Sequence, residues 1–135
     1  MPSSDEPLEV YVDRSLGQAI VPAALRDLGF AVHTELSVFG RVREGVPDSV
    51  WLERAAREGW VVFTKDAKIR YRIAERTALT GGGVRAFVLA GGNLSGSDQA
   101  NCFVQNINRI RRACRDRGPF IYAVHADRIV RIFPA

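Results

Sequence analysis

The feature that most constrains the fold is a short, uninterrupted apolar segment in the middle of the chain. Residues 60–63 (Trp-Val-Val-Phe) are all apolar, with Gly59 before them and Asp66 shortly after. A strand with one face in water alternates apolar and polar residues, whereas a continuous apolar run between turn residues is typical of a strand buried on both faces. Such a strand needs helices on each side of its sheet. The segment therefore predicts an α/β fold with a central sheet.

Other segments share the β-branched and aromatic composition of strands. They are residues 8–12, 30–34, 84–89, 120–124 and 129–133. The last two are joined through Ala126 and Asp127 and predict a C-terminal hairpin. Helical patterns separate the earlier segments, so the first strands are expected to be parallel.

The segments between the strands carry helix signals, such as Pro22 in a first turn and Gly59 after a last one. The expected helices cover residues 21–28, 47–58, 68–76 and 97–117. The last is the longest, because its apolar residues recur every three or four positions and form one stripe. Residues 35–47 have an irregular pattern, which predicts a loop with at most one helical turn.

Length and composition fit a single domain over residues 1–135. The chain is 47% hydrophobic and 25% charged, as in ordinary soluble globular proteins. No apolar run approaches the roughly 18 residues of a membrane span. The first seven residues, Met-Pro-Ser-Ser-Asp-Glu-Pro, lack the apolar core of a secretory signal. We therefore expect a cytoplasmic protein without membrane contact.

The cysteines and histidines give no sign of a disulfide or a zinc site. Cys102 and Cys114 lie on one expected helix, about 18 Å apart along its axis, which is too far for a disulfide. Neither belongs to a Cys/His pattern with zinc spacing. His33 and His125 lie on expected strands without the spacing of a metal pair. All four are expected to be structural.

Charge is distributed unevenly along the chain. Residues 1–63 hold 10 acidic residues against 6 arginines, and residues 64–135 hold 13 basic residues against 5 acidic ones. This asymmetry fits a polyanionic partner such as nucleic acid, engaged by the second half, and equally a solvated basic face or an acidic protein partner. RNA contact or the helix dipole would explain the arginines that crowd the end of the long helix. They are Arg109, Arg111, Arg112, Arg115 and Arg117.

Three aspartates fall where strands end or a helix begins. Asp13 follows the first strand, Asp66 follows the third, and Asp48 begins the helix that leads into the third strand. In open α/β sheets, ligands bind beyond the carboxyl ends of the strands. If the first and third strands are neighbours, the three carboxylates can meet at one edge of the sheet.

Such a cluster needs a cation. Two carboxylates about 4 Å apart repel by about 4 kcal/mol at an effective dielectric near 20. With oxygen ligands alone, the expected ion is Mg²⁺ or Mn²⁺, which activates water and neutralises charge on a phosphodiester. Each aspartate also has a purely structural explanation. Asp48 and Asp66 can be helix N-caps worth about 1 kcal/mol each, and Asp13 can begin a turn.

Three motifs together resemble the PIN-like ribonuclease fold. They are Asp13-Arg14-x-Leu16-Gly17, Asp48-x-x-Trp51 and Gly59-Trp60-Val61-Val62-Phe63-Thr64-Lys65-Asp66. The resemblance spans roughly residues 8–90 and is nearest to the VapC-type toxins of bacterial toxin–antitoxin pairs. It implies a PIN-like three-layer sandwich with a central, mostly parallel sheet. The expected C-terminal hairpin is compatible with it.

The resemblance also implies an activity: a Mg²⁺- or Mn²⁺-dependent endoribonuclease that hydrolyses RNA and is inhibited by a cognate antitoxin. Asp13, Asp48 and Asp66 match the acidic metal ligands of the family. The usual pattern has one more acid, on a helix between the second strand and the Asp48 segment. Glu35 and Glu44 are the candidates here, and a second metal depends on them. A homodimer is compatible with the family.

Arg14 and Lys65 each flank a proposed metal ligand. Either can hold the scissile phosphate or stabilise transition-state charge, or can form a salt bridge that orients the carboxylates. Two other functional classes remain open. One is a PIN-like module that binds RNA or a partner without cutting. The other is a receiver-like phosphotransfer domain, but the lysine expected late in such a fold is absent, because Lys65 and Lys68 both lie mid-sequence.

Overall fold

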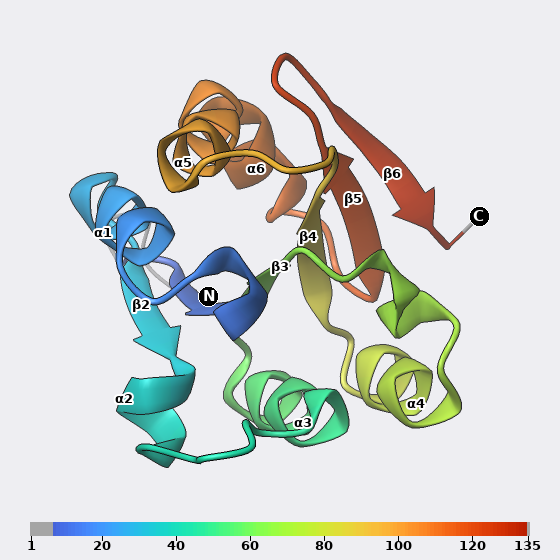
Figure 1. The fold of residues 1–135 in the computed structure, drawn as a ribbon. Helices are drawn as coiled ribbons and strands as arrows, with labels where there is room; N and C mark the ends of the chain where they lie inside the picture. The colour runs from blue at the N-terminus through green and yellow to red at the C-terminus, as the bar shows by residue number, and fades with distance from the viewer. Residues whose placement is uncertain (1–6, 135) are drawn as a thin grey trace.

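The computed structural model describes residues 7–134, which form an α/β sandwich of three layers (Figure 1). The central sheet has the strand order β2-β1-β3-β4-β5-β6. All neighbouring pairs are parallel except β5 and β6, which form an antiparallel hairpin. The predicted fold class is confirmed. The N-terminal residues 1–6, on which the expectation about a secretory signal depends, lie outside the described part.

The strands are β1 (Glu9–Val12), β2 (Ala31–Thr34), β3 (Val61–Thr64), β4 (Arg85–Leu89), β5 (Phe120–Val124) and β6 (Ile129–Phe133). The α-helices are α1 (Ile20–Asp27), α2 (Glu35–Phe39), α3 (Asp48–Glu58), α4 (Ile73–Gly81), α5 (Gly96–Gln105) and α6 (Ile107–Ala113). Two short 3₁₀ helices, η1 (Arg14–Leu16) and η2 (Ala67–Arg70), follow β1 and β3.

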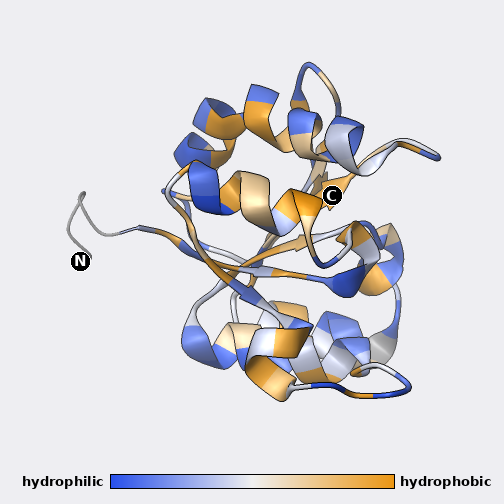
Figure 2. Cartoon of the chain, turned by 60° about the vertical axis from the view of Figure 1, so that its left-hand side comes forward, coloured by the Kyte–Doolittle hydropathy of each residue, from blue (hydrophilic) through white to orange (hydrophobic). Residues whose placement is uncertain are grey.

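Two apolar cores lie on opposite faces of the sheet, and the strands contribute to them alternately. Every residue of β3 is buried, as its uninterrupted apolar sequence predicts. On β1, Val10 and Val12 pack in the core beneath α1, α5 and α6, whereas Tyr11 packs in the core beneath α3 and α4. Figure 2 shows the apolar strands running between the two helical layers. Burial on both faces fixes the position of each strand end.

The predicted single helix over residues 97–117 is wrong, because the structure divides it into α5 and α6. Asn106 lies between them and is completely buried. Its side-chain amide donates to the carbonyl oxygens of Cys102 (2.8 Å) and His125 (2.7 Å), so it ties the break to the loop before β6. The apolar stripe continues across this break, and sequence periodicity therefore did not reveal it.

The predicted helix over residues 68–76 is also two elements, η2 and α4. Arg72 lies between them with an extended backbone (φ −77°, ψ 132°). The irregular segment before α3 contains one short helix, α2, in agreement with the expected single turn.

Cys102 and Cys114 are free and buried, as expected. None of the helices within residues 7–134 is long and apolar enough to cross a membrane.

Candidate functional site

The first and third strands are neighbours, as the aspartate hypothesis requires. β1 pairs in parallel with β3, and the Asp13 amide donates to the Phe63 carbonyl (2.9 Å), one residue beyond the end of β1. On the other side of β1, Thr34 at the end of β2 pairs with Val12. Three strand ends therefore lie together at the carboxyl edge of the sheet.

Asp13 is 5% exposed and is held by two hydroxyl groups. Its Oδ2 accepts hydrogen bonds from Ser15 Oγ (2.6 Å) and Thr64 Oγ1 (2.9 Å). The same Thr64 oxygen accepts from the Asp66 amide (3.1 Å), and Ser15 Oγ accepts from the Lys65 amide (3.1 Å). The turn after β1 and the turn after β3 are thus joined through the Asp13 carboxylate.

Asp48 and Asp66 share one cationic group. Arg72 Nη1 donates to Asp66 Oδ2 (2.7 Å) and to Asp48 Oδ2 (3.3 Å). Asp48 Oδ1 accepts from the indole N–H of Trp51 (3.0 Å), and Asp66 Oδ1 accepts from the Lys68 amide (2.9 Å). Asp66 is therefore the N-cap residue of η2. In α3 the N-cap position is occupied by Pro47, and Asp48 is the first helical residue.

Glu35 is the acidic residue next to this group, and Glu44 lies exposed in the following loop. Glu35 begins α2 directly after β2 and is 7% exposed. Its Oε1 accepts from the Val46 amide (2.7 Å), and its Oε2 lies 3.8 Å from Arg14 Nη1. Of the two candidates for the fourth acid, only Glu35 occupies the carboxyl edge on a helix.

The pKa directions show that these carboxylates interact. The pKa of Asp48 is raised, chiefly by burial and also by the negative charges of Asp13 and Asp66, while the Trp51 hydrogen bond and the Arg72 guanidinium act in the opposite direction. Burial likewise raises the pKa of the Tyr11 phenol, with further contributions from the carboxylates of Asp13, Glu35 and Asp48. The region therefore carries an excess of negative charge.

Within residues 7–134, no three His, Cys, Asp or Glu side chains are already arranged around a point that could hold a metal ion. The donor set nevertheless fits a hard divalent ion. It consists of carboxylate oxygens, the ligands that such ions prefer. The buried Tyr11 hydroxyl beside them has no hydrogen-bond partner among the described residues. A buried hydroxyl without a partner costs about 1–3 kcal/mol, and a water molecule of a hydrated ion would offset that cost.

The predicted basic site residues differ in their contacts. Arg14 is about half exposed and faces Glu35, which agrees with the orienting salt bridge considered from the sequence. Lys65 contributes its backbone amide, and its ammonium forms no ion pair in the described part of the chain, so its role as a phosphate ligand stays a prediction.

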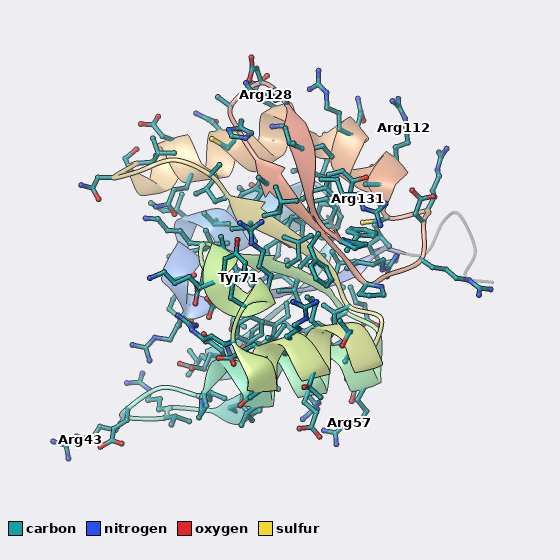
Figure 3. All side chains as sticks on the ribbon, turned by 90° about the vertical axis from the view of Figure 1, so that its right-hand side faces the viewer. Arg43, Arg57, Tyr71, Arg112, Arg128 and Arg131 are labelled. Carbon is teal, nitrogen blue, oxygen red and sulfur yellow. The ribbon has the colours of Figure 1, made fainter. Side chains whose placement is uncertain are left out.

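The arginines near the end of the predicted long helix lie away from the acidic residues. Arg112 belongs to α6, which leads into the opposite end of the sheet. In Figure 3, Arg112 and Arg43 project from opposite sides of the molecule.

Sequence reasoning assigned no role to four residues that shape the site. Ser15 and Thr64 stand two positions from an aspartate within the quoted motifs, and that spacing is a usable signal. Tyr11 alternates with two valines that enter the other core, so its position followed from strand periodicity. Arg72 gave no signal, because its contacts depend on the turn between η2 and α4.

Comparisons with known proteins agree with this architecture. Residues 8–91 match the family model described as "PIN like domain". The chain is also 38% identical over 124 residues to a curated protein of Mycobacterium tuberculosis named "Putative ribonuclease VapC45", an alignment that covers 91% of this chain and 90% of that protein. No solved structure matches the chain significantly. The first two findings confirm the resemblance that the motifs indicated.

Proposed function

We propose that this chain, which belongs to the PIN-like domain family, is a divalent-metal-dependent endoribonuclease that acts as the toxin of a toxin–antitoxin pair. What supports the proposal is the position of Asp13 and Asp66 after the neighbouring strands β1 and β3, with Asp48 at the start of the helix that leads into β3. Two of them share the Arg72 guanidinium, and Thr64 links the third to the same turn. The name of the mycobacterial relative supports the reaction class.

The residues of this chain have separable tasks in that reaction. Asp13, Asp48, Asp66 and Glu35 would hold Mg²⁺ or Mn²⁺, which supplies an activated water and positive charge at the scissile phosphate. Thr64 and Ser15 fix the orientation of the Asp13 carboxylate by donating two hydrogen bonds to one oxygen. Trp51 fixes one oxygen of Asp48 in the same way. These bonds hold the acids in place before any ion arrives.

The biological setting follows from the family. We infer a single cytoplasmic domain that pairs with a cognate antitoxin protein, with RNA as substrate. A homodimer is compatible with the family.

Cleavage of RNA by purified protein tests the proposal. Asp13→Asn and Asp66→Asn are expected to fold normally, because asparagine accepts the hydroxyl bonds at position 13 and caps η2 at position 66. Each should reduce Mn²⁺-dependent cleavage of a labelled single-stranded RNA by at least about 100-fold, since metal-based charge stabilisation contributes several kcal/mol. Expression of the wild type should arrest bacterial growth, and the Asp66→Asn variant should not. Retained cleavage in both variants would refute the proposal.

One observation favours the alternative of a PIN-like module that binds RNA or a protein without cutting. Arg72 already supplies a cation to Asp48 and Asp66, so the acids are partly neutralised without a metal. Calorimetric titration with MnCl₂ separates the two functions. The nuclease binds Mn²⁺ with a defined stoichiometry that Asp13→Asn abolishes, whereas the binding module shows no Mn²⁺ binding but retains salt-sensitive RNA binding.

A further inference from the structure

A pocket of about 450 Å³ adjoins the acidic site on the side of Glu35. The short helix α2, the turn after β1 and the loop after α2 line it, and it is open to solvent. Its lining residues are Arg14, Gln18, Glu35, Leu36, Gly40, Arg41, Val42 and Arg43. Because Glu35 belongs both to this lining and to the acidic site, a molecule in the pocket would lie beside the proposed point of cleavage.

The loop after α2, which forms one wall of the pocket, is held near its end by a hydrogen bond to Glu35. The Val46 amide donates to Glu35 Oε1 (2.7 Å). Gly45 has a left-handed backbone (φ +80°), and a side chain at this position would collide with the Arg14 guanidinium. Arg14 in turn lies 3.8 Å from the second oxygen of Glu35. The wall is therefore held by the same glutamate that we place in the acidic site.

The pocket is positively charged, with three arginines against one glutamate. Arg14 offsets the charge of Glu35. Arg41 and Arg43 are exposed, and neither forms an ion pair or a side-chain hydrogen bond within residues 7–134. Two free guanidinium groups on one wall are suited to phosphate oxygens, which they bind with paired, charge-assisted hydrogen bonds.

The same pocket offers an apolar surface. Leu36 is 52% exposed and Val42 is 40% exposed, so two aliphatic side chains of the lining are accessible to a ligand. This combination matches a nucleotide. The cationic wall suits its negatively charged phosphate, and the apolar surface suits the flat face of its base. Single-stranded nucleic acid presents both groups to a protein, whereas a duplex hides its bases.

We propose that this pocket binds a nucleotide of single-stranded RNA that neighbours the scissile bond, with Arg41 and Arg43 on its phosphate and Leu36 and Val42 against its base. The inference rests on the proposed function, because it takes RNA as the substrate class. It assigns a binding role to a loop outside the motifs that identify the family.

The experiment measures RNA binding in EDTA, where cleavage does not occur. A fluorescein-labelled single-stranded RNA is titrated with wild type, Arg41→Gln/Arg43→Gln, and the control Arg112→Gln/Arg115→Gln. The control removes the same charge from exposed positions at the opposite edge of the sheet. Anisotropy is recorded from about 50 to 200 mM KCl, a range in which phosphate contacts are strongly salt-sensitive. Equal melting temperatures establish that both variants are folded.

The Arg41→Gln/Arg43→Gln variant should bind RNA roughly tenfold more weakly at low salt, and the slope of log K against log salt should fall by about 1.4, the value for two lost contacts with a single strand. The control should stay within about twofold of the wild type. Equal losses in both variants, or none in either, overturn the proposal. A pocket made for an acidic peptide would bind labelled hexaglutamate through Arg41 and Arg43 while RNA binding stays unchanged, and this too overturns it.

Mn²⁺-dependent cleavage by the wild type is measured in parallel and reports separately on the proposed function. If the wild type fails to cleave RNA and the pocket variant still shows the reduced salt slope, the nuclease proposal fails and the RNA subsite stands. If the wild type cleaves RNA and the pocket variant binds normally, only the subsite proposal fails.

Discussion

The two edges of the parallel sheet carry charge of opposite sign in different surroundings. At the carboxyl edge, Asp13 and Glu35 are nearly inaccessible and receive hydrogen bonds from hydroxyl and amide groups. At the amino edge, the last helical turns present arginines to solvent, such as Arg26, Arg57 and Arg112. Buried, hydrogen-bonded charge is found at the first edge, and solvent-exposed charge at the second.

The difference follows from the architecture. Each helix that precedes a parallel strand ends at the amino edge, so its negative dipole end favours cations there whatever the protein does. The basic second half of the chain therefore reflects the helix ends in part, and Arg112 and Arg115 are remote from the acidic site. Charge along the sequence suggested a polyanionic partner for the second half, whereas the free arginines nearest the acids, Arg41 and Arg43, come from the acidic first half.

The largest effect is expected at the carboxyl edge. Glu35→Gln should reduce Mn²⁺-dependent RNA cleavage by about 10- to 100-fold, because one charged oxygen near the ion is lost. The fold should persist, since the glutamine oxygen still accepts from the Val46 amide. Glu44→Gln is the matched control, with the same chemical change in the exposed loop, and should cleave RNA at the wild-type rate. Equal rates for the two variants would remove Glu35 from the site.

A smaller effect is expected at the amino edge, where Cys114 ends α6. Burial raises the pKa of its thiol to about 11 from an ordinary 9.0, with the Arg85 guanidinium acting weakly in the opposite direction. Since the folded protein holds this proton more tightly than the unfolded chain, the thiol stabilises the fold below about pH 9, and that contribution is lost as the pH rises to about 11. The stability difference between wild type and Cys114→Ala should shrink by about 2 kcal/mol between pH 8 and 10.5. Denaturant titrations measure it, and a constant difference would show an accessible thiol.

The smallest effect is expected at Arg72, which forms ion pairs with Asp48 and Asp66. Arg72→Gln removes the cation shared by Asp48 and Asp66, so the metal-free protein should melt at a lower temperature. Mn²⁺ should bind roughly threefold more tightly, because no guanidinium competes with it for the two carboxylates. Arg54→Gln breaks the exposed pair with Glu58 and should change neither quantity. Weaker Mn²⁺ binding in Arg72→Gln would mean that Arg72 positions the acids for the ion.

Most of the fold followed from the sequence because burial on two faces leaves a strong pattern. The apolar run of β3 and the turn residues around it predicted a covered parallel sheet, and the positions of Asp13 and Asp66 followed from the ends of β1 and β3. The break at Asn106 did not follow, because it depends on hydrogen bonds to Cys102 and His125, residues whose proximity only the folded chain creates.

The sequence predicted the places of the aspartates in the fold but did not single out Glu35. Asp13 and Asp66 follow neighbouring strands and Asp48 begins a helix, so the topology predicted where these residues lie in the fold. Their role as metal ligands stays a prediction. Glu35 and Glu44 remained the two candidates for the fourth acidic residue, because the five-residue helix that begins at Glu35 is too short to show a helical period. The capping box between Thr34 and Ser37 is the local signal that would have placed it.

The indole that holds Asp48 gives this protein an optical probe of its own. Trp51 donates its ring N–H to Asp48 and stacks on Tyr11 with ring centroids 5.2 Å apart. Any ion or polypeptide that captures the Asp48 carboxylate must alter the environment of that ring. In a Trp60→Phe background, the fluorescence emission of Trp51 would follow occupancy in real time, without a label and without turnover.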